Sequence, residues 1–233
     1  VRVGNPYLKP EYVDAYEFSI NKLANHYSFG TTLYYRQTNN AFLRYVTVSD
    51  SGVAHVTFTN LNTNTSFGFE VNTKFDVTKS WNISANFNLF RNEVDANNIV
   101  EGLTNHNLSA SGRFSSNLSL PKNFLFQINS NYRSPMVVAQ GQMLASFNLD
   151  AGLKKDVMKK KGTLTLNVTD IFNTQQMGMN LNDTYFSVDF VRKKESRVAT
   201  LSFTYRFGVQ DKNQKQQDRN NQQQNYQNQD MGF

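Results

Sequence analysis

Apolar and polar residues alternate along most of this chain, and the alternation is cleanest near its C-terminal end. Residues 199–208 read ATLSFTYRFG, in which every second position is apolar: Leu201, Phe203, Tyr205 and Phe207. Successive side chains of a β-strand point to opposite sides, so this pattern predicts a strand with one apolar and one polar face. The apolar face must then contact either a protein core or lipid.

The same alternation recurs in earlier segments of the chain. They cover residues 15–21, 27–36, 67–77, 81–90, 107–120, 124–133, 145–155 and 162–170. We therefore predict an all-β chain with about nine long strands. Strands of about ten residues, tilted by about 40°, cross about 25 Å, which matches the apolar band of an outer-membrane barrel. Strands of soluble sandwiches are shorter, with about six residues.

The predicted strands are joined by links that alternate in length. Tight links fall at residues 77–81, 121–122 and 156–162, and long polar links at 95–104, 134–144 and 171–196. Residues 35–58, with the sequence SDSG near the tip, predict a hairpin that continues above the membrane. Short periplasmic turns and long extracellular loops are typical of an antiparallel transmembrane β-barrel in the bacterial outer membrane. The polar faces of the strands would then line a wet interior.

Composition agrees with a β protein that has a large polar face. Only 39% of the 233 residues are hydrophobic and the mean hydropathy is −0.56, yet aromatic residues reach 13%. That aromatic content is not typical of a disordered chain. No apolar run of about 18 residues exists, which excludes a transmembrane helix, and the absence of cysteine excludes disulfides. No signal peptide is present at Val1, so we expect that the chain was cut from something longer.

The positive charge of the chain does not predict a nucleic-acid partner. The formal net charge is +6 and the isoelectric point is near 9.4, but lysines and arginines are scattered along strands and turns. The dense run at 154–161 is typical of a solvated turn. Residues 209–233 are rich in Gln and Asn with balanced charges, which predicts a disordered periplasmic tail. Alternatively, this tail folds against a periplasmic partner.

No enzymatic constellation stands out, so we expect no catalysis, cofactor or metal. The histidines are isolated, at His26, His55 and His106, and no nucleophile motif or phosphate-binding glycine loop is present. Four charged residues are predicted on polar faces and could line a substrate path, or pair with one another or with a plug: Glu70, Lys74, Arg113 and Arg133. Four loop residues could contact a ligand or a surface lipoprotein, or simply fill the loops: Tyr45, Met177, Met179 and Tyr185.

Several segments resemble the C-terminal halves of TonB-dependent receptor barrels. The sequence GNPYLKPEYVDAYEFSI at 4–20 resembles their GNP-x-L-x-PE segment, and NVTDIFNT at 167–174 resembles the D-x-F-N element before their last extracellular loop. The sequence ESRVATLSFTYRFG at 195–208 is similar to their closing strand. Residues 34–46 and 58–72 are similar to the outer-membrane β-barrel branch of the Bacteroidota.

This resemblance implies a barrel of about 22 antiparallel strands around an N-terminal plug. Residues 1–208 would supply about nine strands from its closing end, and an odd number supports truncation, since bacterial single-chain barrels have even numbers. The parent protein would import a scarce or large nutrient with energy transmitted by the TonB system through its missing N-terminal part.

The resemblance also implies that the barrel-assembly machinery reads the final strand through Leu201, Phe203, Tyr205 and Phe207. In this class the signal ordinarily lies at the extreme C-terminus, whereas here residues 209–233 follow it. Lipid of the outer membrane would surround the strands.

Two other classes of function stay open at this point. The first is a barrel without energised transport, either a passive porin or a component of an assembly or secretion complex. The second is a soluble β-sandwich that acts as an adhesin or a glycan-binding module. A sandwich would bury the apolar faces beneath a second sheet, so the surroundings of Phe87, Phe126 and Phe203 distinguish it from a barrel.

Overall fold

The computed structural model describes residues 2–49, 51–182 and 186–207, and most residues of these ranges lie in β-strands. The strands are β1 (Tyr12–Leu23), β2 (Tyr27–Asn39), β3 (Phe42–Val48), β4 (Ala54–Asn60), β5 (Thr63–Thr78), β6 (Trp81–Asp95), β7 (Thr104–Leu120), β8 (Phe124–Arg133), β9 (Met136–Val138), β10 (Gly141–Met143), β11 (Ser146–Val157), β12 (Gly162–Val168), β13 (Met177–Asn182), β14 (Ser187–Arg192) and β15 (Ala199–Tyr205). Two short 3-10 turns, η1 (Pro121–Asn123) and η2 (Met158–Lys160), complete the elements.

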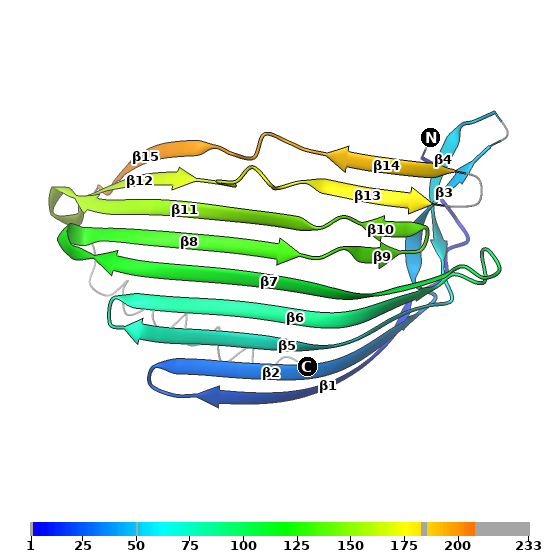
Figure 1. Cartoon of the computed structure of the whole chain (residues 1–233), viewed down its shortest axis with the longest axis horizontal. Coiled ribbons are helices and arrows are strands. Elements are labelled where there is room, and N and C mark those ends of the chain that lie inside the picture. Colours follow the sequence, from blue (N-terminus) through cyan, green and yellow to red (C-terminus); the bar gives the residue numbers. More distant parts are fainter. Residues whose placement is uncertain (1, 50, 183–185, 208–233) are drawn as a thin grey trace.

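Nine of these strands form one sheet in the order β1-β2-β5-β6-β7-β8-β11-β12-β15 (Figure 1). Every neighbouring pair is antiparallel. The sheet confirms the prediction of nine antiparallel strands, each of which overlaps one of the alternating segments. β8 begins and ends at the residues that the pattern indicated, Phe124 and Arg133.

The alternation of residue types gives the sheet two unlike faces, because the register keeps residues of one kind opposite each other. Phe69 lies opposite Leu89 and Val71 opposite Phe87, whereas Asn72 lies opposite Asn86. We call one side the apolar face, which carries Phe69, Val71, Phe87, Leu89, Phe114, Leu118, Phe126, Leu164, Leu166, Leu201 and Phe203. The other side is the polar face, which carries Glu70, Asn72, Asn86, Asn88, Arg113, Asn117 and Asn131.

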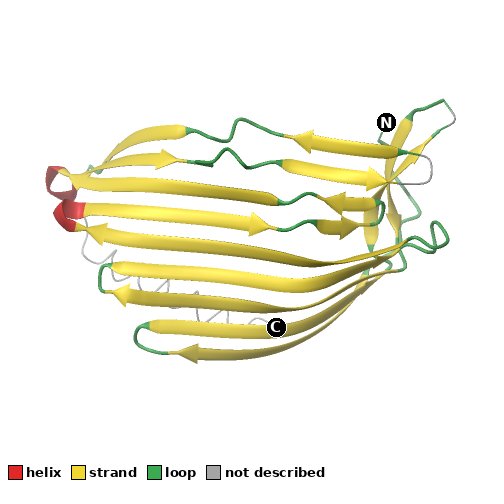
Figure 2. Cartoon of the chain, in the orientation of Figure 1, coloured by secondary structure: helices red, strands yellow, loops and turns green. Residues whose placement is uncertain are grey.

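The two ends of the sheet differ in the length of their connections (Figure 2). At one end, the turn end, strands are joined by residues 24–26, residues 79–80, η1 and the segment around η2. At the opposite end, the loop end, the connections are residues 40–62, 96–103, 134–145 and 169–198. The predicted tight and long links are therefore confirmed in the described part of the chain.

Three of the long connections contain strands of their own. β3 and β4 form the hairpin predicted for residues 35–58, and β14-β13-β10-β9 form a four-stranded sheet. This sheet continues the wall beyond β15, β12, β11 and β8 (Figure 1). The expectation of about ten residues per strand is wrong for β12 and β15, which have 7 residues each. Their ladder stops at the irregular segment that begins at Thr169, and the wall resumes at β13.

The large sheet has two free edges in the described residues, because β1 and β15 lie at opposite sides of it and do not pair (Figure 1). It is thus an open wall rather than a closed barrel. The predicted polar tail at 209–233 lies outside the described residues.

A small hydrophobic core lies at the loop end, not between the strands of the wall. It consists of Leu61, Val94, Ala96, Val137 and Ala139. Val94 and Val137 belong to β6 and β9, so this core fastens the connection between β8 and β11 to the wall. The phenylalanines of the apolar face do not belong to this core.

Candidate functional site

The apolar face is uncovered in the described part of the chain. Phe87 is 43% exposed and Phe203 is 54% exposed, and Phe126 is half-buried. The rings contact neighbours on the same face, as Phe69 and Phe87 do with centroids 6.2 Å apart. These residues do not pack beneath a second sheet, so the face is available to lipid and lacks the partner layer of a sandwich.

This apolar face has polar borders at both of its ends. On β6 it runs from Trp81 to Leu89, and beyond Leu89 the outward positions carry Arg91 and Glu93, which form an ion pair at 3.5 Å. Counted over both faces, this stretch has nine residues. A tilted β-strand that crosses a membrane requires about 9–11 residues. At the turn end, Lys155 Nζ lies 4.6 Å from the ring centroid of Phe124. Aromatic rings and amines at the border are typical of a membrane-spanning wall.

The polar face carries several clusters of side-chain hydrogen bonds between neighbouring strands. Asn86 Nδ2 donates to Glu70 Oε1 at 2.9 Å and to Asn72 Oδ1 at 2.7 Å. Further along, Gln127 donates to Asn117 at 2.6 Å, and Asn117 donates to Asn82 at 3.0 Å. Each amide has its partner directly across the ladder or diagonal to it, the geometry in which cross-strand pairs interact. This face is therefore a fixed polar surface suited to water.

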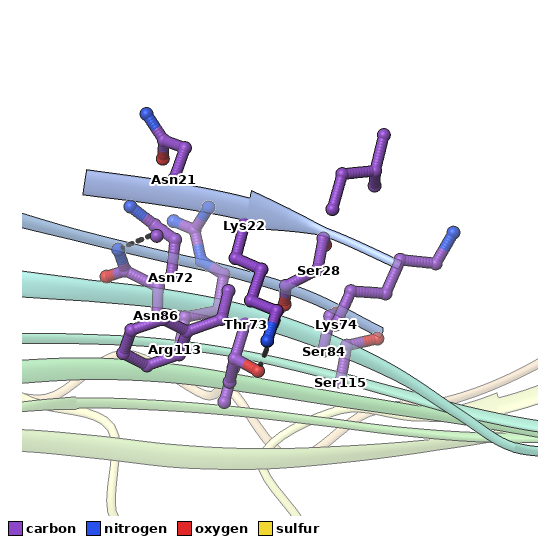
Figure 3. A pocket seen from close by; sticks show the side chains of 14 residues that line it. Asn21, Lys22, Ser28, Asn72, Thr73, Lys74, Ser84, Asn86, Arg113 and Ser115 are labelled. Carbon is purple, nitrogen blue, oxygen red and sulfur yellow. Dashed lines mark hydrogen bonds between the residues drawn. The ribbon is translucent and has the colours of Figure 1, made fainter. Parts of the chain in front are cut away.

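A hollow of about 570 Å³ lies between the side chains of β1, β2, β5, β6 and β7 (Figure 3). Asn72, Asn86 and Arg113 stand together in it, whereas Asn21 and Lys22 leave β1 on opposite sides. The polar groups that line it are amides, hydroxyls and three cations, Lys22, Lys74 and Arg113, of which Lys74 and Arg113 lie on the polar face. Such a set suits a polar or anionic molecule held by hydrogen bonds.

The four predicted lumen residues all lie on the polar face. Glu70 accepts from Asn72 and Asn86, and Arg113 Nε donates to Asn131 Oδ1 at 3.0 Å. Lys74 lines the hollow, and Arg133 stands on β8 with a buried Nε that has no hydrogen-bond partner among the described residues. The structure brings Glu70 and Arg113 to one region, while Arg133 lies two residues further along β8 from Asn131.

Amide side chains hold the loop end together, and sequence reasoning missed them. Asn105 Nδ2 donates to the carbonyls of Val138 at 3.1 Å and Gly141 at 2.9 Å. Gln140, which is 3% exposed, accepts from the Val46 N–H at 2.9 Å and donates to the Val46 carbonyl at 2.8 Å. These side chains replace backbone ladder bonds where strands end. No sequence signal would single them out, because Asn and Gln are common throughout this chain.

The segment that resembles GNP-x-L-x-PE runs along β4 at the loop end. Asn5 Nδ2 donates to the Phe58 carbonyl at 2.9 Å. Lys9 and Asn60 form a double link, with Lys9 N–H donating to Asn60 Oδ1 at 2.8 Å and Asn60 Nδ2 donating to the Lys9 carbonyl at 3.0 Å. This segment therefore fixes the hairpin of β3 and β4 before the chain enters β1.

Asp170 anchors the irregular segment between β12 and β13. Its carboxylate is 1% exposed and accepts from the N–H groups of Thr174 and Gln175, both at 2.9 Å, and from the Ser196 hydroxyl. The Asp170 N–H donates to Asp150 Oδ1 at 2.8 Å. Burial favours the neutral acid, but these hydrogen bonds outweigh burial and hold the pKa of Asp170 below its ordinary value. The D-x-F-N element thus ties both connecting segments of β13 and β14 to the wall.

The predicted assembly residues and loop residues are placed as follows. Leu201, Phe203, Tyr205 and Phe207 are all exposed at the free edge, between 39% for Tyr205 and 89% for Phe207. The Phe203 ring lies over Gly162, where a Cβ would approach it to 3.1 Å. Met177 is 48% exposed, but Tyr45 is only 8% exposed and offers little of its ring to a partner. Met179 is half-buried in β13, and Tyr185 lies outside the described residues.

The described residues contain neither a group of His, Cys, Asp and Glu side chains that could hold a metal nor a helix able to cross a membrane. What they do contain is a long antiparallel wall with an uncovered apolar band, polar borders and a hydrogen-bonded polar face. This combination defines the class of outer-membrane β-barrel proteins. The chain belongs to the outer membrane protein beta-barrel family, whose model matches residues 1–205. No curated protein and no solved structure matches the chain.

Proposed function

We propose that this chain is the closing part of the wall of a TonB-dependent-receptor-type importer, which takes up a nutrient across the outer membrane. The observation that carries the proposal is a nine-stranded wall with one lipid-compatible face, one wet face and two edges that are unpaired among the described residues. Open sheet edges are not viable in a membrane, since each unpaired backbone group lacks a partner there. Further strands of the parent protein would pair with β1 and β15 and close the barrel.

The polar face would line the path of the imported molecule. Glu70 and Arg113 are held by neighbouring amides, so their positions are set before any substrate arrives. Preorganised polar groups reduce the cost of binding. Around this face, Met177 at the loop end would contact a ligand or a surface lipoprotein, and the exposed final strand would be read by the barrel-assembly machinery.

A passive porin or a component of an assembly complex is the second candidate, because a wet, hydrogen-bonded wall would serve an open pore equally well. Two measurements on the full-length protein separate the candidates. An energised importer is plugged, so it conducts little current in a planar bilayer and binds the periplasmic domain of TonB. A steady open-pore current without TonB binding would overturn the importer and favour the porin.

The assignment of the two faces is tested with adjacent residues on β6. Phe87→Lys places an amine on the apolar face, and Asn86→Lys places the same amine on the polar face. A lysine on the lipid face destabilises a barrel by about 2–4 kcal/mol at the midplane and by less toward the borders. Phe87 lies between the middle of the band and its border at Leu89, so Phe87→Lys should lower the free energy of unfolding in lipid vesicles by about 2 kcal/mol. Asn86→Lys should change it by less than about 1 kcal/mol. Equal losses for both variants would contradict the orientation of the wall.

A further inference from the structure

Positive charge gathers at the turn end of the wall, between the ends of β7 and β15. The residues of this basic collar are Lys122, Lys154, Lys155, Lys159, Lys160, Lys161 and Arg206. The carboxylate that lies among them is Asp156, whose Oδ1 accepts from the Thr163 hydroxyl at 2.9 Å. The collar therefore carries a large net positive charge within two neighbouring turns.

The collar begins where the apolar face ends. Leu120, immediately before η1, is 41% exposed, and Met158, the first residue of η2, is 61% exposed. Lys155 lies between them on the outward side, with its amine over the Phe124 ring. Its aliphatic stem thus follows the apolar surface while the amine stands at the border, as snorkelling lysines do in membranes.

The amines of the collar are not engaged by carboxylates of the described residues. The ion pairs among the described residues are Arg36–Glu17 and Arg91–Glu93, and both lie away from the turn end. Arg206 donates to the Lys160 carbonyl at 3.2 Å, which draws β15 and η2 together and holds the cations at the same level. A phospholipid has an anionic headgroup above apolar acyl chains. Cations held beside an apolar surface can therefore contact the headgroup while the surface contacts the chains.

We infer that the basic collar binds the headgroups of anionic phospholipids in the leaflet that the turn end faces. This inference rests on the membrane placement proposed above. Acyl chains would cover the apolar face next to Leu120 and Phe124, and the phosphate of the same lipid would meet the collar amines. Each basic residue close to an anionic lipid surface raises the affinity of a protein for that surface by about fivefold. The collar should therefore select anionic over zwitterionic lipid.

Trp81 provides a local reporter, because it lies at the turn end in the same outward row as Leu118 and Phe126. The full-length protein is reconstituted in vesicles that contain either dibrominated phosphatidylglycerol, which is anionic, or dibrominated phosphatidylcholine, which is zwitterionic. Bromine quenches the fluorescence of a tryptophan in contact with it. The signal of Trp81 is the difference between each protein and its Trp81→Phe derivative, and competition with unbrominated lipid gives the relative affinity of the two lipids.

Wild type should prefer phosphatidylglycerol by at least about fivefold. The variant Lys159→Gln/Lys160→Gln/Lys161→Gln should bring the ratio of the affinities for phosphatidylglycerol and phosphatidylcholine near one. The variant Lys159→Arg/Lys160→Arg/Lys161→Arg should retain the wild-type ratio because charge is conserved. A matched control that also removes three exposed charges, Arg192→Gln/Lys194→Gln/Arg197→Gln at the loop end, should leave it unchanged. Heat-modifiable migration on a gel verifies that each variant is folded.

The outcomes test the membrane placement of the wall and the lipid selectivity of the basic collar separately. Absence of quenching by either lipid would overturn the membrane placement itself. Equal quenching by the two lipids in wild type would overturn the collar while leaving the membrane placement intact. A preference that survives the triple glutamine substitution would assign the selectivity to another part of the protein and also overturn the inference.

Discussion

The turn end and the loop end of this wall are built by different means. At the turn end, residues that are adjacent in sequence close each hairpin, as the link of residues 79–80 between β5 and β6 does. At the loop end, the connections are held by side chains that bond to backbone far away in the sequence, such as Gln140 to Val46. The loop end also has its own hydrophobic core, whereas the turn end has a collar of lysines.

The two ends therefore depend on contacts of different range in the sequence. Local contacts suffice at the turn end, so a change there should have small and local consequences. The loop end depends on a few long-range contacts, so the removal of one contact should loosen a whole connection. Three substitutions test this contrast, and the largest effect is expected at Asp170.

Asp170→Asn should remove the main anchor of the loop end. The amide keeps the volume of the side chain but replaces an acceptor oxygen with a donor that faces the N–H groups and hydroxyl now bonded to the carboxylate. Loss of charged hydrogen bonds in a buried site should lower the free energy of unfolding by about 3 kcal/mol. Urea titration of the full-length protein in lipid vesicles measures it.

The matched control for this substitution is Asp189→Asn on β14, where the side chain is exposed. It should change the free energy of unfolding by less than about 0.5 kcal/mol. If Asp170→Asn were equally mild, the D-x-F-N element would not be an anchor, and the irregular segment after β12 would need another explanation.

Gln140→Leu should loosen the hairpin of β3 and β4, which Asn5 and Lys9 still hold, rather than unfold the wall. The substitution leaves the N–H and the carbonyl of Val46 without their Gln140 partners, which costs about 2 kcal/mol locally. Hydrogen exchange should therefore accelerate by about 30-fold at residues 42–60 and stay unchanged in β7 and β8. Gln142→Leu in β10, whose side chain is exposed, is the control. Uniform acceleration in all strands would mean that the hairpin and the wall open together.

The strands of the wall could be predicted from the sequence because one rule, alternation, governs each of them independently. The rule failed after Val168, where β12 ends early because Asp170 draws the chain toward Asp150 and Ser196. Those partners are distant in sequence, and the local pattern of apolar and polar residues does not indicate them. The amides of the loop end escaped prediction for the same reason, since Asn105 and Gln140 are chemically like the many Asn and Gln residues elsewhere. The placement of Glu70, Lys74 and Arg113 on one face followed from parity alone.

The smallest effect is expected at the turn end, in η2. Lys159 has φ of 56°, a left-handed conformation that costs a residue with a Cβ about 1 kcal/mol, whereas Lys161 has φ of −78°. Lys159→Gly should therefore raise the free energy of unfolding by about 0.5 kcal/mol, the relief being partly offset by the entropy of glycine in the unfolded chain. Lys161→Gly removes the same charge without relieving strain and should lower it by a similar amount. Urea titration of the two variants side by side gives the sign directly, and equal losses would show that charge, not backbone conformation, sets the stability of this turn.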